Sequence, residues 1–150
     1  EKQKAKYIYG MREGQFRIFF ERAMAKKGKT GDLLLQMCES RLDNVVYRLG
    51  LAPSRRAARQ FVLHGHIEVN GRKAAIPSMV VNVGDVVAVK DNAKSKDAAS
   101  RSVEAATGAQ LPVWMQFDKT NLKAEVLAVP TREQIAPIVD EQAIVELYSR

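Results

Sequence analysis

The chain has 150 residues, of which 46% are hydrophobic and 27% are charged, and its formal net charge is +7. This length fits one ordinary domain or two small ones, and the composition is that of a globular protein, which excludes a disordered or fibrous chain. Residues 1–73 carry a net charge of +9 and residues 74–150 one of −2. The first half is therefore expected to face an anion, either nucleic acid or a lipid surface.

Targeting signals and cysteine content narrow the class further. No stretch approaches the ~18 apolar residues of a membrane-spanning helix, and no signal peptide is visible. A soluble, cytoplasmic protein without a membrane partner is therefore expected. The one cysteine, Cys38, excludes an internal disulfide and a Cys-based zinc site within this sequence. It lies in an apolar helical pattern, which indicates a small buried side chain.

Helical patterns dominate the first third of the chain. Residues 1–27 predict a helix that is interrupted or kinked near Gly10 and Gly14. Spacings of three and four residues then predict one apolar stripe, formed by Phe16, Phe19, Phe20 and Ala23. Residues 28–32 form a break, and the apolar pattern of residues 33–49 predicts one continuous second helix that ends at Gly50.

The middle of the chain changes from helix to strand. Ser54 is a good N-cap for a helix that runs to about Leu63, and Gly65 suits a left-handed helix end. Residues 67–69 alternate as a strand does, and Asn70-Gly71 is a strong hairpin signal, after which the chain returns through residues 72–75. Residues 79–83 and 86–89 flank Gly84-Asp85 and predict another strand pair.

The last third is less regular. Residues 91–110 are polar and rich in Ala and Ser, which indicates a solvated helix or a flexible connector. Residues 114–117 and 125–129 predict two more strands, and residues 131–135 begin a short helix before the chain's end. The predicted fold class is thus α+β.

The helix after Ser54 concentrates positive charge on one side. At ~100° per residue, its apolar residues occupy the other side. Guanidinium groups bind phosphate oxygens in pairs, which a Lys ammonium cannot do, and the N–H groups near Ser54 add a second element that attracts anions. No acidic residue lies near these arginines in the sequence, so they are expected to be unpaired. The polar side carries Arg55, Arg56, Arg59, Gln60 and His64, and the apolar side Ala57, Ala58, Phe61 and Val62.

Basic residues and tyrosines also alternate at the start of the chain. Lys2, Lys4, Lys6, Arg12 and Arg17 surround Tyr7 and Tyr9. This mixture suits RNA, because cations bind phosphates and ring faces stack on bases. The alternative, that the tyrosines are core residues and the lysines are solvated, is equally open.

Two other patterns have weaker chemical interpretations. His64 and His66 flank Gly65, but further metal ligands are missing nearby, so RNA contact or a helix-end role is favoured. The triplet Arg41-Leu42-Asp43 is similar to the one around the catalytic aspartate of pseudouridine synthases. Because Asp43 lies in an apolar helical pattern and 150 residues leave no room for a separate catalytic domain, a non-enzymatic protein is predicted.

Taken together, these segments resemble a known family. ESRLDNVVYRLGLAPSRRAARQFVLHGHIEVNGRKAAIPSMVVNVGDVVAV resembles the S-four RNA-binding domain, which is built on the αL motif. That motif is shared with rRNA pseudouridine synthases, some tRNA synthetases and a heat-shock ribosome-binding protein. The flanking stretches EKQKAKYIYGMREGQFRIFFERA, KGKTGDLLLQMCESRLDNVVYRLG and EQAIVELYSR resemble the bacterial S-four family of small-subunit ribosomal proteins.

The resemblance implies a two-domain body. A helical domain comprises residues 1–40 and is completed by residues 130–150, and an inserted αL-type RNA-binding domain with a small antiparallel sheet comprises residues 41–129. It also implies a protein of the cytoplasmic ribosome that binds 16S rRNA at a helix junction of the 5′ domain and helps to initiate subunit assembly. Expected neighbours are proteins S-five and S-three and the mRNA near its entry channel, where the family affects decoding accuracy. Some members repress translation of their own operon.

The residues that match the family's RNA-facing positions are expected to bind rRNA, and no cofactor or small-molecule substrate is expected. Zinc is expected only in the family's N-terminal extension, which has no counterpart in this sequence. The chain also departs from many relatives in having Ala57 and Ala58 where an acidic residue is common. The RNA-facing candidates are Lys2, Lys4, Tyr7, Arg12, Arg17, Arg41, Arg48, Ser54, Arg55, Arg56, Arg59, Gln60, His64, His66, Asn70 and Arg72.

Two rival functions follow from the shared motif. An RNA-modifying enzyme that docks through it needs a catalytic domain of its own. A free ribosome-associated stress factor is the other rival, and a high-salt wash of mature small subunits separates it from an integral subunit protein. A non-catalytic rRNA-binding protein is the reading that fits the whole chain.

Overall fold

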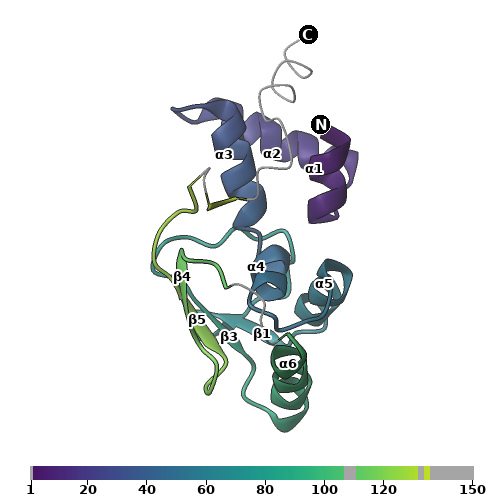
Figure 1. Ribbon diagram of the computed structural model, residues 1–150. Coiled ribbons are helices and arrows are strands. Elements are labelled where there is room, and N and C mark those ends of the chain that lie inside the picture. Colours follow the sequence, from purple (N-terminus) through teal and green to yellow (C-terminus); the bar gives the residue numbers. More distant parts are fainter. Residues whose placement is uncertain (1, 107–110, 132–133, 136–150) are drawn as a thin grey trace. The chain divides into compact units, whose positions relative to one another are not determined.

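A computed structural model describes residues 2–106, 111–131 and 134–135 of the chain (Figure 1). The chain divides into two compact units. One unit is Ser40–Val129, and the other comprises Glu1–Glu39 and Pro130–Arg150. Helices and a small antiparallel sheet are both present, so the α+β prediction is confirmed. The assignment of a helical domain to residues 1–40 and 130–150 and of an αL-type RNA-binding domain to residues 41–129 stays a prediction.

The first unit contains α1 (Lys2–Tyr9), α2 (Glu13–Ala25) and α3 (Thr30–Glu39). Gly10 has a φ of +64°, which ends α1 in a conformation that suits glycine. The predicted interruption is therefore confirmed at Gly10, but it is wrong at Gly14, which lies inside α2. The predicted apolar stripe of α2 is buried, and α3 adds Leu34, Leu35, Met37 and Cys38 to the buried residues.

The prediction of one helix over residues 33–49 is wrong. The chain leaves the helix after α3, and α4 begins only at Leu42 and runs to Arg48. Arg41 has extended backbone angles and forms an isolated antiparallel bridge with Val80. The first N–H groups of a helix have no partner inside it. Here those of Leu42 and Asp43 donate to the carbonyls of Met79 and Pro77, at 2.7 and 3.1 Å.

Local sequence patterns correctly predicted helix α5 and the hairpin that follows it. Helix α5 (Arg55–Leu63) has Ser54 as its N-cap, and Gly65 has a φ of +80°. Strand β1 (Ile67–Val69) turns at Asn70-Gly71 into β2 (Arg72–Lys73). Both turn residues have positive φ, 54° and 80°, as a type I′ hairpin requires.

The sheet has five antiparallel strands in the order β2-β1-β3-β5-β4. Its remaining strands are β3 (Val86–Val89), β4 (Met115–Asp118) and β5 (Lys123–Val126). The predicted strands at residues 114–117 and 125–129 are thus confirmed with shifted bounds. The strand predicted at residues 79–83 is wrong, because β3 pairs with β1 and β5 instead.

One face of this sheet forms the core of the second unit. The register places Val69, Val87, Ala124 and Phe117 in one row across four strands. The opposite face carries Glu68, Lys123 and Asp118. Helices α4 and α5 and α6 (Ala93–Ala105) cover the inner face (Figure 1). Their core residues are Leu42, Val45, Val46, Ala58, Val62 and Ala99.

Helix α6 occupies most of the segment predicted as a solvated helix or connector. Asn92 caps it by accepting a 2.8 Å hydrogen bond from the Ser95 N–H. The short helix predicted at residues 131–135 lies partly, and the chain's end wholly, outside the described residues.

Because Leu34 is fully buried in the first unit, Leu34→Ala should lower the free energy of unfolding by about 2–5 kcal/mol, which a urea titration followed by circular dichroism measures. Ile18 on α2 is 48% exposed, and Ile18→Ala is the matched control. A similar loss in both variants would contradict the assignment of Leu34 to the core.

Candidate nucleic-acid interface

Helix α5 presents a polar face and packs an apolar one, as predicted. The Ser54 hydroxyl accepts a hydrogen bond from the Ala57 N–H at 3.0 Å, which fixes the first turn. Ala58 and Val62 are buried in the core, and Ala57 and Phe61 pack against it. Arg56, Gln60 and His64 are exposed on the other side.

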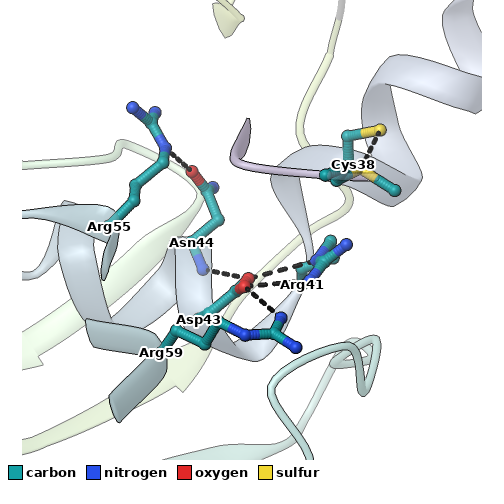
Figure 2. Close-up of polar contacts among 7 residues, drawn as sticks. Cys38, Arg41, Asp43, Asn44, Arg55 and Arg59 are labelled. Atoms are coloured by element: carbon teal, nitrogen blue, oxygen red, sulfur yellow. Dashed lines mark hydrogen bonds and ion pairs between the residues drawn. The ribbon is translucent and has the colours of Figure 1, made fainter. Parts of the chain in front are cut away.

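Helix α4 contacts two of the α5 arginines, contrary to the expectation that they are unpaired. Arg55 Nε donates to Asn44 Oδ1 at 3.2 Å, and its guanidinium lies 4.5 Å from the centre of the Tyr47 ring. Arg59 Nη1 lies 4.0 Å from Asp43 Oδ2 (Figure 2). The sequence did not indicate these partners, because they lie 8 to 16 residues before the arginines in the chain.

Asp43 and Asn44 contact the α5 arginines, which the sequence did not indicate. Both are buried, although both lie in an apolar helical pattern. Two buried polar residues in such a pattern require partners, and this requirement is the signal that could have pointed to them. Asp43 also accepts two hydrogen bonds from Arg41, so its carboxylate is ion-paired (Figure 2).

The expected RNA contact of Arg41 is wrong in this structure. The side chain is fully buried, and Nε and Nη2 donate to the Asp43 carboxylate at 3.1 and 2.9 Å. Arg48, also in the candidate set, is half-buried at the end of α4.

The hairpin residue Asn70 has a structural role of its own. Its side-chain NH₂ donates to Asp85 Oδ1, and its side-chain oxygen accepts from the Val86 N–H, both at 2.9 Å. These bonds join the hairpin to the start of β3. Arg72, the next candidate along the hairpin, is exposed.

His66 is held between α5 and α6. Its ring stacks on Phe61 with 4.7 Å between centroids, and Nδ1 lies 2.6 Å from the Ser95 hydroxyl oxygen. Burial, followed by the positive charges of His64, Lys94 and Lys90, lowers the pKa of His66 from its ordinary value. The exposed His64 lies nearby, with 6.4 Å between the two ring centroids.

The candidates of the first unit differ in their exposure to solvent and in their contacts. Lys2 and Lys6 both contact Glu13, at 3.3 and 2.8 Å, and Arg17 Nε lies 3.7 Å from Glu21. Lys4 and Arg12 are exposed. The Tyr7 side chain lies outside the described residues.

The alternative that Tyr9 is a core residue is the one the structure supports. Tyr9 is buried, and its hydroxyl donates to Glu39 Oε2 at 2.8 Å. Cys38 is also buried, with Sγ 3.7 Å from Met11 Sδ, as expected for a small core side chain.

Over the described ranges, the structure contains no cluster of three His, Cys, Asp or Glu side chains that could hold a metal ion. None of the helices within those ranges has the length and apolar character needed to cross a membrane.

Two family models match the chain in adjacent segments. Residues 1–39 match the ribosomal protein S4/S9 N-terminal domain, and residues 40–87 match the S4 domain, the S-four domain expected above. The second match contains α4, α5 and the hairpin. The face of α5 that carries Arg55, Arg56 and Arg59, called the arginine face below, therefore lies inside it.

Curated relatives match along the whole chain. Small ribosomal subunit protein uS4 of Acetivibrio thermocellus is 54% identical over 150 residues, which are all of this chain and 72% of the relative. The uS4 protein of Acidithiobacillus ferrooxidans is also 54% identical, with the same coverage. That of Chlorobaculum parvum is 49% identical over all of this chain and 74% of its own length.

The two family models and these relatives therefore define a structural, non-enzymatic ribosomal protein with an S4 RNA-binding domain. The chain belongs to the family of small ribosomal subunit protein uS4.

The lowered pKa of His66 predicts a pH dependence of stability. The unfolded chain binds the proton more readily than the folded one, so the free energy of unfolding should fall as pH drops below the ordinary histidine pKa of about 6.5. His66→Gln should make this dependence less steep in urea titrations between about pH 5 and pH 7. Equal slopes in wild type and variant would contradict the prediction.

Proposed function

We propose that this chain binds 16S rRNA directly, at a helix junction of the 5′ domain, as a structural component of the small ribosomal subunit. The carrying observation is the arginine face of α5, which is fixed by a Ser54 cap and a core-packed back within a matched S4 domain. The names of the relatives as small ribosomal subunit proteins support the same function.

In the proposed mechanism, electrostatic capture precedes a fit of shape. Arg55, Arg56 and Arg59 bind phosphate oxygens, and this contribution dominates affinity and depends on salt. The N–H groups at the start of α5 add positive potential next to Arg55. A-form RNA is recognised chiefly through its shape and backbone, so a helix held rigidly against a sheet suits it better than a flexible basic tail does.

The first unit supplies a second set of cations for the same RNA. Lys4 and Arg12 are exposed there. The ion pair of Arg17 with Glu21 is open to solvent, and that of Lys2 with Glu13 is partly so. Exposed ion pairs contribute little stability, so exchange of a carboxylate for a phosphate costs little.

We propose further that early binding of this chain helps to initiate subunit assembly, because a protein that holds RNA helices at a junction reduces their freedom before other proteins arrive. Contacts with proteins S-five and S-three, a position near the mRNA entry channel in the cytoplasmic ribosome, and an effect on decoding accuracy complete the proposal. Chemical footprinting of isolated 16S rRNA with this chain tests the target. Protection spread evenly over the RNA would contradict a 5′-domain junction site.

Removal of two arginines should change the salt dependence of RNA binding. Arg55→Ala combined with Arg59→Ala should make the plot of log K against log salt concentration less steep by about 1.4–1.8, since each of the two lost phosphate contacts removes about 0.7–0.9. Filter binding to a 16S rRNA 5′-domain transcript over a series of salt concentrations measures this slope.

Arg101→Ala is the matched control for this prediction. Arg101 is exposed on α6 and pairs with Asp97 on the same helix. Its removal should leave the slope near the wild-type value. If the double variant also keeps the wild-type slope, Arg55 and Arg59 do not bind phosphate.

A further inference from the structure

We propose that a second phosphate-binding site lies at the C-terminal end of α5 and binds the backbone of the same RNA as the arginine face. The site consists of His64, His66, Lys90 and Lys94, called the α5–α6 basic cluster below. The inference rests on the proposed rRNA binding. It adds two lysines, Lys90 and Lys94, that are not among the RNA-facing candidates predicted from the sequence.

Three segments of the second unit bring the α5–α6 basic cluster together. The Lys90 N–H donates to the His66 carbonyl at 2.7 Å, which joins the end of β3 to the start of β1. His66 Nδ1 lies 2.6 Å from the hydroxyl oxygen of Ser95, which follows Lys94 in the first turn of α6. The His64 ring lies next to that of His66. Residues that are far apart in the sequence therefore meet around one imidazole.

Positive charge gathers in the cluster. Burial is the first cause that lowers the pKa of His66, and the charges of His64, Lys94 and Lys90 follow in that order. No carboxylate, that of Glu68 on the same strand included, is among these causes. Because its pKa is lowered from about 6.5, His66 is neutral at pH 7, and the two lysines carry the charge of the cluster. A phosphate beside them would offset the repulsion among these groups.

The acidic residues next to the cluster in the chain have other basic partners. Lys96 Nζ lies 2.8 Å from Asp91 Oδ1, and Arg101 pairs with Asp97 further along α6. Over the described ranges, neither lysine of the cluster forms an ion pair, and both are exposed. Their ammonium groups are therefore available to an external anion.

The cluster continues the polar side of α5. Arg56, Gln60 and His64 follow one another at intervals of four residues, so they lie along one side of the helix, and all three are exposed. At 1.5 Å per residue, Arg56 and His64 are about 12 Å apart along the helix axis. One phosphate cannot contact both ends, so the cluster binds a second position of the RNA backbone.

Loss of the two lysines should change the salt dependence of RNA binding. Lys90→Gln combined with Lys94→Gln should make the plot of log K against log salt concentration less steep by about 1.4–1.8 for the 16S rRNA 5′-domain transcript, as two lost phosphate contacts require. Because both side chains are exposed, the variant should unfold in urea as wild type does.

The matched control removes two lysines from the β4–β5 hairpin. Lys119→Gln combined with Lys123→Gln changes the net charge equally and should leave the slope near the wild-type value. An unchanged slope in the Lys90 and Lys94 variant, or an equal loss in both variants, would overturn the proposal. Failure of wild type to bind the transcript above a scrambled RNA would instead reject the proposed function, so the two failures are distinguishable.

A tethered probe tests the position of the cluster on the RNA. Cys38 is the one cysteine of the sequence and is buried, so an added surface cysteine is labelled selectively. Iron–EDTA attached at Lys94→Cys and at Arg56→Cys should cleave the transcript at different nucleotides, and at Lys119→Cys it should cleave much more weakly. Identical cleavage from positions 94 and 56, or cleavage from position 94 no stronger than from position 119, would overturn the proposal.

Discussion

The buried pair of Arg41 and Asp43 is the interaction on which the geometry of the candidate interface in the second unit depends. A buried ion pair adds little net stability compared with an apolar pair of the same volume, yet loss of one partner costs about 3–5 kcal/mol. Such a pair is therefore better understood as a device that fixes geometry. Here it lies at the first turn of α4, next to the extended backbone of Arg41 and its bridge to Val80.

The start of α4 makes contacts both with the loop after the hairpin and with helix α5. Toward the loop after the hairpin, the Ser40 carbonyl accepts from the Val81 N–H at 2.9 Å, and the first N–H groups of α4 donate to residues 77 and 79. Toward the surface, the same turn aims Asp43 and Asn44 at α5. The start of α4 thus joins the loop between β2 and β3 to the residues that contact the arginines of α5.

The parts of the fold that the sequence predicted are those with short-range causes. Ser54 caps the helix that follows it, and Asn70-Gly71 meets the positive φ requirement of its own turn. The stripe of Phe16, Phe19 and Phe20 follows from helical spacing alone. Each of these needs only residues within one or two turns of the chain.

The errors share a long-range cause. Arg41 was expected at the RNA, and a continuous helix was expected through Ser40, because neither the bridge to Val80 nor the bonds to residues 77 and 79 can be read from nearby residues. Likewise, the pairing predicted at Gly84-Asp85 is wrong because Asp85 instead bonds Asn70 and the Asn82 N–H, and β3 finds its partners in β1 and β5. Pairing across the chain is settled by the core, not by the local pattern.

The distribution of charge over the second unit supports the proposal that α5, and not the outer face of the sheet, binds RNA. One row on the outer face of the sheet consists of Lys73, Glu68, Ala88, Lys123 and Asp118, so two positive and two negative side chains balance there. Such a row offers phosphate no net attraction. The polar side of α5 carries three arginines, and α4 contacts two of them. The surface that attracts phosphate is thus determined less by the net charge of +7 than by where positive side chains balance the carboxylates. A buried arginine that balances a buried aspartate is the clearest instance of this in the chain.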